Sequence, residues 1–454
     1  MTQKAKQYKE ILKQNPRMYR TVQKMICENE DAASSAICFV LAPSLGAFIQ
    51  WLLLKALSDG KRRLYFLARD GYFMYRAALI FCQTLDLPIE CRYLSCSRYS
   101  LRIPTFHLDQ NAALDYVCRD GIDVTFEKIL ARAGLTSQEQ ETIFSYFPDF
   151  IQKNETIPRN MLSTVRRRLR ACPLFLEYMN THSKQALPQL AGYLKQEGLL
   201  EEIPDGIVDS GWIGSMQKTL NEVLSYLGRT QKLEGYYWGL YDLPCGVSEN
   251  DYHCYYFRPS ADLRKKVFFN NCLFETIYTA PHGMTLCYKK DGNIYNPWYG
   301  PITKQRKKFI EKTELYLMQY IRILAQDCRK KGFQSDLLSD DRRVLSQLLC
   351  MFMTTPSKSE AEIFGRLLFS DDVFANESTP LAPLMTEQEL HASHIVPKLF
   401  HTQYPRKKFL KQSAWYEGSV VRSSKQIRSH LRQYTFYKYI RYLRQIYDFK
   451  KNRR

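Results

Sequence analysis

The sequence lacks the short motifs that mark the commonest nucleotide-binding sites. It contains neither the GxxxxGK[ST] loop that surrounds nucleotide phosphates nor the GxGxxG turn of dinucleotide-binding domains. No DxD motif of the haloacid-dehalogenase phosphatases precedes a helix in the right place. These absences argue against an NTPase, a dinucleotide-dependent dehydrogenase and a phosphatase domain.

Cysteine occurs at 13 positions but never in a zinc-binding pattern. Cys91 and Cys96 are too far apart for a CxxC pair, and no group of Cys and His has the spacing of zinc ligands along the chain. Residues 1–15 are polar and basic and contain no apolar core of a secretory signal. We therefore expect reduced, mostly buried thiols in a cytoplasmic protein.

Only one long stretch lacks charge. Residues 32–54 contain no charged side chain, and their length is about what a membrane span needs. Ser34, Pro43 and Gln50 interrupt the apolar run, and Lys55 follows it directly. We expect a buried helix, kinked near Pro43, that lies against the first strand rather than across a membrane.

Acidic residues are too few to balance the basic ones. The 65 Lys and Arg exceed the 46 Asp and Glu by 19, so the partner is expected to be anionic. Residues 401–454 hold most of this excess, because fifteen Lys and Arg there are opposed only by Glu417 and Asp448. This basic tail is a solvated helical face, a contact with an anionic membrane surface, or a nucleic-acid site. No nucleic-acid-binding fold signature accompanies it, so we rank the membrane surface above nucleic acid.

The order of the remaining patterns predicts an α/β fold with a parallel, phosphoribosyltransferase-like (Rossmann-like) sheet. Two strands at 63–68 and 91–96 flank a helix at 72–85, which is the spacing of a right-handed β-α-β unit. The sheet resumes at 207–208. Further strands are expected at 235–241 and 252–257.

The rest of the chain is expected to be helical. Residues 107–202 have the pattern of an inserted helical lobe, punctuated by proline. We therefore predict a catalytic domain over 1–300 that contains this lobe, and a helical C-terminal region over 301–454 that ends in the basic tail.

The segment 209–215 has the composition of a phosphate-binding turn. Asp209 follows an apolar strand, and Gly211, Gly214 and Ser215 lead into a helix. Backbone N–H groups and the helix dipole favour an anion at such a point, while Asp209 suits the hydroxyls of an attached sugar. The pattern equally fits an ordinary capped strand–helix turn. Trp212 is either a platform for a sugar or a core aromatic.

A second anion site is expected at the end of the first strand. There Arg69 offers a guanidinium for a phosphate, and Gly71 opens the turn. Asp70 suits proton abstraction from an attacking hydroxyl, or a contact with Mg²⁺ through water. Ser97 and Arg98 follow the next strand at the same edge of the sheet. The alternative is a salt bridge across a turn.

Together the two sites fit a sugar with a phosphate at one end and a pyrophosphate at the other, such as phosphoribosyl pyrophosphate. The usual phosphoribosyltransferase loop has two adjacent acids. Here Ser210 stands in place of the second acid, and Trp212 is also unexpected at its position.

Four segments taken together resemble one bacterial family. They are residues 66–72 (FLARDGY), 97–98 (SR), 208–217 (VDSGWIGSMQ) and 280–283 (APHG). The family is the phosphoribosyltransferase-like domain of ribofuranosyltransferases in surface-polysaccharide assembly, which is often fused to a haloacid-dehalogenase-type phosphatase. The resemblance spans roughly residues 30–300.

The resemblance implies a glycosyltransferase that moves 5-phosphoribosyl from phosphoribosyl pyrophosphate to a glycan hydroxyl, with inversion at the anomeric carbon. Mg²⁺ would bind through the pyrophosphate, and a separate phosphatase would remove the 5-phosphate. The acceptor is expected to be a lipid-linked glycan, which suits a cytoplasmic protein that is peripheral on the inner face of the membrane.

The resemblance also assigns roles to residues. Asp209 would bind the ribose hydroxyls, while Ser210, Gly211, Trp212, Gly214 and Ser215 would surround the 5-phosphate and sugar. Arg69, Gly71, Ser97 and Arg98 would hold the pyrophosphate. Asp70 is the first choice as base or metal-side acid, and Glu275 and His282 are the second choices.

Two other functions remain open at this point. One is a different sugar-phosphate transferase or hydrolase on the same sheet. The other is a non-catalytic, membrane-peripheral scaffold in a polysaccharide cluster.

Overall fold

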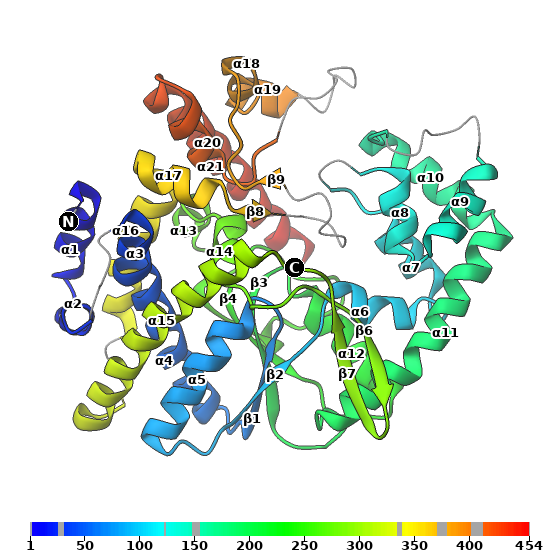
Figure 1. The fold of residues 1–454 in the computed structure, drawn as a ribbon, viewed down its shortest axis with the longest axis horizontal. Coiled ribbons are helices and arrows are strands. Elements are labelled where there is room, and N and C mark those ends of the chain that lie inside the picture. Colours follow the sequence, from blue (N-terminus) through cyan, green and yellow to red (C-terminus); the bar gives the residue numbers. More distant parts are fainter. Residues whose placement is uncertain are drawn as a thin grey trace.

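A five-stranded, fully parallel sheet forms the centre of the protein (Figure 1). The computed structural model describes residues 2–25, 31–121, 124–147, 155–333, 338–369, 379–400 and 412–453. The strand order is β2-β1-β3-β4-β5, built from β1 (Arg63–Leu67), β2 (Glu90–Leu94), β3 (Asp205–Trp212), β4 (Glu234–Leu240) and β5 (Tyr252–Phe257). The predicted α/β class with a parallel, Rossmann-like sheet and helical regions is confirmed.

Helices cover both faces of the sheet, because successive strand side chains point to opposite sides. Leu64, Phe66 and Val208 pack with α4 (Ala42–Ser58), α5 (Gly71–Leu85), α15 (Lys304–Lys331) and α16 (Leu338–Thr354) in one core. Tyr65 and Ile207 point to the other face, where α11 (Pro173–Gln196) and α12 (Ser215–Tyr226) pack in a second core. α15 and α16, which follow Pro301, therefore share the main core with the sheet.

The uncharged stretch forms one long, buried helical segment. After α1 (Gln3–Leu12) and α2 (Pro16–Gln23), the chain runs through α3 (Ala32–Ala36), the π-helical turn η1 (Ile37–Leu41) and α4. In the described residues Ala32–Ser58 is the one helical run long and apolar enough to cross a membrane, and 83% of its most apolar window is buried. This burial agrees with the expected core helix, and the π-helical turn directly precedes Pro43.

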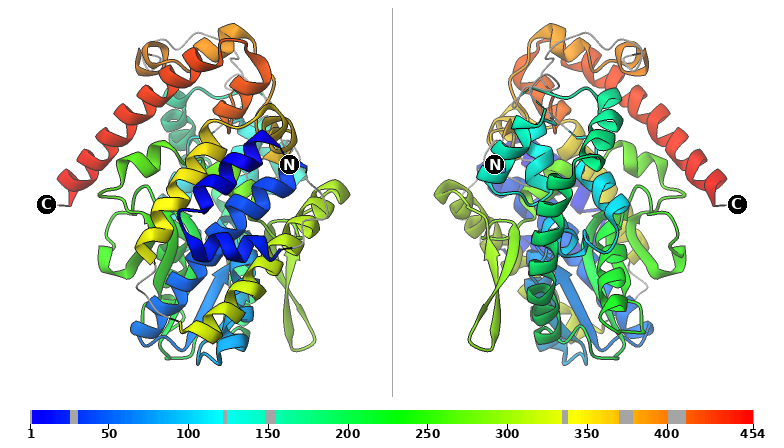
Figure 2. Two further views of the ribbon diagram at one scale, coloured as in Figure 1. Left: turned by 90° about the vertical axis from the view of Figure 1, so that its left-hand side faces the viewer. Right: turned by 90° about the vertical axis from the view of Figure 1, so that its right-hand side faces the viewer.

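A helical lobe follows β2 and has its own core. It comprises α6 (Arg98–Arg102), η2 (Ile103–Thr105), α7 (Gln110–Val117), α8 (Phe126–Arg132), α9 (Ser137–Ser145), η3 (Arg159–Met161), α10 (Leu162–Arg170) and the first half of α11. Figure 1 shows this lobe beside the sheet, and Figure 2 shows α11 running from it along the sheet. Near its entry the backbone N–H of His107 donates to Oγ of Ser183 on α11 at 3.0 Å.

A hairpin and two short helices connect the sheet to the C-terminal helices. After η4 (Glu249–Asp251) and β5 come α13 (Leu263–Val267), α14 (Asn271–Ile277) and the antiparallel pair β6 (Thr285–Asp291) and β7 (Ile294–Tyr299). Figure 2 shows this hairpin projecting from the body of the molecule.

The C-terminal region adds α17 (Lys358–Gly365), the short pair β8 (Leu368–Phe369) and β9 (Thr379–Pro380), α18 (Glu387–His391), α19 (Ile395–Phe400), α20 (Tyr416–Ser423) and α21 (Ile427–Asn452). The basic helix expected from residue 425 is α21. Lys438 turns inward and pairs with buried Glu417 at 2.5 Å. Of the basic tail, Arg406, Lys407, Lys408, Lys411 and Arg454 lie outside the described residues.

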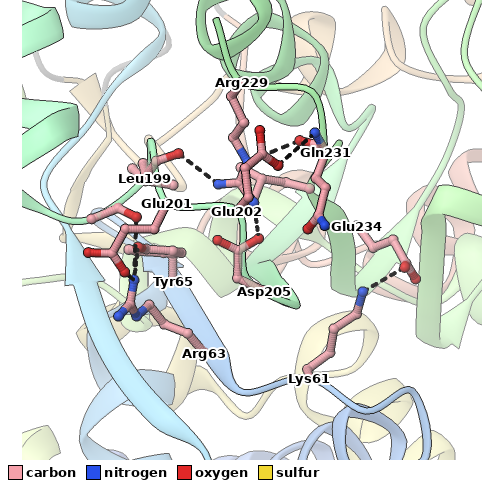
Figure 3. A network of polar contacts seen from close by, with 12 residues as sticks. Lys61, Arg63, Tyr65, Leu199, Glu201, Glu202, Asp205, Arg229, Gln231 and Glu234 are labelled. Atoms are coloured by element: carbon pink, nitrogen blue, oxygen red, sulfur yellow. Dashed lines mark hydrogen bonds and ion pairs between the residues drawn. The ribbon is translucent and has the colours of Figure 1, made fainter.

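A polar network joins the amino ends of the strands, opposite to the end where the site lies (Figure 3). Arg229 pairs with Asp205 at the start of β3 at 2.5 Å, and both side chains are almost fully buried. Arg63 at the start of β1 pairs with Glu201 at 2.8 Å, and Lys61 pairs with Glu234 at the start of β4 at 2.6 Å. These contacts fix the strand register away from the carboxyl ends.

Candidate active site

The strand order places a crevice at the carboxyl ends of β1 and β3. The chain leaves β1 toward β2 on one side and returns to β3 on the other, so the connections diverge at this point. Ligands bind at such a switch point in open parallel sheets. A cavity of about 730 Å³ lies there, and its walls come from the ends of β1, β2 and β3 and from α12, α14 and α15.

The cavity brings together nearly all the residues singled out from the sequence. Those that line it are Arg69, Asp70, Ser97, Arg98, Asp209, Ser210, Gly211, Trp212, Gly214, Ser215, Glu275 and His282. Gly71 is the exception. It begins α5 directly beneath Phe66, where a Cβ would lie 3.1 Å from the Phe66 carbonyl carbon, so close packing accounts for it.

The segment 209–212, predicted to be a loop, is strand, and this part of the prediction is wrong. β3 keeps its pairing with β4 through Trp212, because Asp209, Gly211 and Trp212 remain in register with their partners. A Cβ at Gly211 would lie 2.0 Å from the carbonyl oxygen of Gly239 on β4, and its φ is +127°. Sheet packing therefore requires this glycine. The turn itself is confined to residues 213–214.

The N-terminus of α12 opens into the cavity. Gly214 is the N-cap with φ +72°, and Ser215 and Met216, which follow it, line the cavity wall. The first N–H groups of a helix have no intrahelical acceptor and carry partial positive charge. A Cβ at Gly214 would lie 2.6 Å from the ring of Tyr252, so a side chain is excluded here as well.

Three carboxyl groups line the same cavity. Asp70 accepts a hydrogen bond from Oγ of Ser210 at 2.6 Å, and Asp209 accepts one from the backbone N–H of Ser210 at 2.9 Å. Glu275 on α14 accepts a hydrogen bond from the indole N–H of Trp212. Each group keeps partial contact with the surface through the cavity.

Burial and mutual repulsion raise the pKa of all three acids. The pKa of Asp70 rises to about 7, chiefly through burial and then through the charge of Asp209. Burial and Glu275 raise the pKa of Asp209 to about 7. Burial and Asp70 raise the pKa of Glu275 to about 8. Acids that exchange protons near neutral pH are suited to general acid–base chemistry.

Cationic side chains face these acids. Arg69 follows β1 and Arg98 follows β2, and both are exposed at the cavity. The peptide between Ala68 and Arg69 is cis. Arg306 on α15, which sequence reasoning missed, donates to the carbonyl of Thr276. Its Nη1 is buried and has no hydrogen-bond partner among the described residues. Burial and the charge of Arg69 lower the pKa of Arg306 to about 10.

Two of the residues expected to contact the substrate, Ser97 and Trp212, make most of their contacts within the protein. Ser97 caps α6 in a capping box with Ser100, and its hydroxyl donates to the carbonyl of Thr285 at 2.6 Å. Trp212 is half-buried among aromatic rings, with Phe269 at a centroid distance of 5.4 Å. Packing thus accounts for most of the Trp212 ring, while its N–H orients Glu275.

His282 lies at the cavity with both ring nitrogens engaged. Its Nδ1–H donates to the carbonyl of Gly283 at 2.8 Å, so Nε2 accepts from the hydroxyl of Tyr93 at 2.8 Å. Burial lowers its pKa. The neutral imidazole therefore fixes the loop 280–283 against β2.

A second cavity, of about 800 Å³, lies between the β4–β5 connection and α21. Its charged lining residues include Asp242, Arg441 and Arg444. It lacks the buried, mutually interacting carboxyl groups of the first cavity. The cavity at the strand ends is therefore the better candidate active site.

No protein-family model matches this chain, and no curated protein matches it.

Proposed function

We propose that the chain is a glycosyltransferase that moves 5-phosphoribosyl from phosphoribosyl pyrophosphate to a glycan hydroxyl. The observation that supports this proposal best is the composition of the switch-point cavity. There a helix N-terminus, the guanidiniums of Arg69, Arg98 and Arg306, and three acids with raised pKa meet. A sugar with an anionic group at each end needs two anion sites and an acid between them.

The 5-phosphate is assigned to the start of α12. Ser215 offers a hydroxyl, and the first turn of α12 after Gly214, where the backbone N–H groups are free, lines the cavity. Asp209, on the strand just before, is assigned to the ribose hydroxyls. In this assignment the segment 209–215 still binds the phosphate, as predicted, but Gly211 is required by the packing of β3 against β4.

The pyrophosphate is assigned to the guanidiniums. Arg69 and Arg98 are exposed at the cavity, and Arg306 adds an unpartnered, buried N–H from another element. Charge-assisted hydrogen bonds from guanidinium groups are suited to phosphate oxygens. These contacts would stabilise the negative charge that develops on the leaving group.

In the transfer step the bond between C1 and the pyrophosphate oxygen breaks, and the acceptor oxygen forms its bond to C1 from the opposite face. The pyrophosphate leaves with the electron pair, and the anomeric centre inverts. The acceptor proton goes to a carboxylate. Asp70, with a pKa of about 7, is the first choice, and Glu275 is the second.

Mg²⁺ fits this site as an ion carried by the substrate. Added positive charge would relieve the repulsion among Asp70, Asp209 and Glu275, which supports this proposal. Among the described residues these three do not converge on one point as a resident metal site does. Asp70 would contact the ion through water. When bound, the ion neutralises charge on the pyrophosphate.

The basic helix supports a role at a membrane surface. α21 exposes Phe436, Leu443 and Tyr447 together with Arg428 and Arg432. Apolar and cationic side chains on one helix are suited to anionic lipid, where each Lys or Arg contributes about 1 kcal/mol. We propose that this helix brings the enzyme to a lipid-linked acceptor, and that a separate phosphatase then removes the 5-phosphate.

Co-flotation of the protein with anionic vesicles tests the membrane contact, and replacing Arg428 and Arg432 by Glu should abolish it. Equal flotation of the wild type and of this double variant would contradict the membrane contact.

Calorimetric titration with phosphoribosyl pyrophosphate and Mg²⁺ tests the function. The wild-type protein should bind saturably, and Asp209→Ala should not. Asp120→Ala, on the surface of the lobe, is the matched control and should bind normally. Circular dichroism shows whether each variant is folded. Absence of binding to the folded wild type would contradict the proposal and would favour a scaffold or another donor.

A further inference from the structure

Three histidines meet where α18, α19 and α21 come together. His391 ends α18, His394 stands just before α19, and His430 lies in the first turn of α21. One ring nitrogen of each lies within 4.8 Å of those of the other two. None of the three lines the switch-point cavity. The proposed transfer reaction therefore leaves this cluster unexplained.

The central imidazole is held in one orientation. His430 is fully buried, and its Nε2–H donates to Oε2 of Glu387 at 2.9 Å. The other oxygen of Glu387 accepts from the hydroxyl of Ser424 at 2.6 Å. With the proton on Nε2, the lone pair of Nδ1 faces Nε2 of His394, 2.8 Å away. A carboxylate behind a histidine fixes metal-ligating imidazoles in this way.

Packing alone explains only part of this cluster. The His394–His430 pair is satisfied by its own hydrogen bond, but His391 makes no side-chain hydrogen bond among the described residues. Its ring centroid nevertheless lies 4.5 Å from His394 and 5.0 Å from His430. A shared ligand at the centre gives all three rings a partner.

We propose that His391, His394 and His430 bind a divalent transition metal, with zinc as the expected ion. Imidazole nitrogens select zinc and similar metals over Mg²⁺ and Ca²⁺, which prefer oxygen. Three protein ligands and one water complete a tetrahedral site. With zinc–nitrogen bonds of about 2.0–2.1 Å, the nitrogens would stand roughly 3.3 Å apart. The 2.8 Å pair therefore needs to open only slightly.

A second group of potential ligands is a poorer candidate. Asp59, Glu234 and His253 also lie close together. The carboxylates there are already paired, Asp59 with Lys55 at 2.5 Å and Glu234 with Lys61 at 2.6 Å. The histidine cluster has no such cation against its ring nitrogens among the described residues.

The metal would tie three elements together. α18 and the turn before α19 supply two ligands, and α21 supplies the third. The ion would thereby fix the start of the basic helix against the α18–α19 segment. This role is independent of the transfer chemistry, so failure of one proposal leaves the other standing.

Metal titration of tag-free, chelator-treated, reduced protein tests the site. Wild type should bind one equivalent of Zn²⁺ that His391→Ala/His394→Ala loses. The matched control is His182→Ala, which removes a histidine that also faces a glutamate, Glu139 at 2.9 Å. It should keep the full equivalent. Glu387→Gln should weaken binding about 10- to 100-fold, as changes behind a ligand do.

Cobalt separates the histidine site from the free thiols. Co²⁺ bound by three imidazoles gives visible d–d bands without the near-ultraviolet charge-transfer band of thiolate ligation. His391 is exposed and His394 half-buried, and circular dichroism of the metal-free double variant shows whether it keeps the wild-type fold. Zinc uptake that is equal in wild type and double variant, or no uptake by wild type, would overturn the proposal.

Discussion

The hydroxyl of Ser210 donates a hydrogen bond of 2.6 Å to Oδ2 of Asp70, across 140 residues of sequence. The bond joins the carboxyl end of β3 to the turn after β1. It stabilises the charged form of Asp70 and lowers its pKa, against burial and Asp209, which raise it to about 7. The pKa of Asp70, in the turn after β1, therefore depends on residues 209 and 210 at the end of β3.

Replacing Ser210 by Ala should raise the pKa of Asp70 further, because the stabilising donor is lost. If Asp70 is the base, the acidic limb of the pH–rate profile for transfer should move to higher pH, by less than about one unit. The measurement is transfer rate against pH, with Ser225→Ala on the exposed side of α12 as control. An unmoved limb would assign the base to another group.

Glu275→Gln should make the protein more stable at high pH. The folded state holds the Glu275 proton up to a pKa of about 8, whereas the unfolded chain releases it near the ordinary value of 4.5. Folded protein binds more protons between these values, so the Glu275 contribution to stability falls as pH rises from about 4.5 to 8.

Because Gln does not titrate, the stability difference between Glu275→Gln and wild type should grow by roughly 1–3 kcal/mol from pH 5 to pH 8. Urea unfolding at the two pH values measures this difference. The exposed Glu141→Gln serves as control and should show no such growth. A constant difference would mean that Glu275 is ionised in the folded protein at pH 5.

Arg306→Met should weaken the binding of inorganic pyrophosphate. The side chain offers a buried, unpartnered Nη1 at the cavity, and hydrogen bonds to charged groups contribute about 1.5–3 kcal/mol. The dissociation constant should therefore rise about 10- to 100-fold. Titration calorimetry measures it. Arg366→Met is the matched control, since that exposed guanidinium also lines the cavity but pairs with Glu362. Equal weakening in both variants would argue for general charge rather than a specific contact.

Asp205→Ala should destabilise the fold without touching the site. The change leaves Arg229 buried without its partner, which costs about 3–5 kcal/mol for buried pairs. Denaturant unfolding measures the loss. Asp120→Ala, which breaks the exposed pair with Arg159, should change stability by less than about 0.5 kcal/mol. A small loss for Asp205→Ala would mean that water reaches Arg229.

Local sequence signals were sufficient for several helices and strands and for most of the cavity lining. The helix predicted at 72–85 and the strand predicted at 252–257 correspond to α5 and β5. The strand pattern and the turn residues at 69–71 are encoded within a few positions, so they could be recognised without the fold. Because the carboxyl ends of parallel strands lie at the same edge of a sheet, the residues after β1, β2 and β3 could be expected to lie close together.

Features that depend on distant partners could not be predicted. The extension of β3 to Trp212 exists because Gly239 on β4 accepts the close approach of Gly211. Arg306 enters the cavity from a helix whose sequence pattern indicates only a basic, amphipathic segment. The meeting of His394 and His430 could not be predicted either, because the two residues are 36 positions apart and belong to different elements.

The lobe between β2 and β3 closes on itself, and this has an evolutionary consequence. Its entry and its long exit helix are bonded to each other through His107 and Ser183, and its apolar residues form a separate cluster. An insertion with adjacent ends and its own interior can be lost, exchanged or enlarged while the strand order stays the same. Tyr116 and Arg119 of the lobe reach the cavity wall. Under the proposed function, exchange of this lobe would change the wall that an acceptor meets and leave the sheet unchanged.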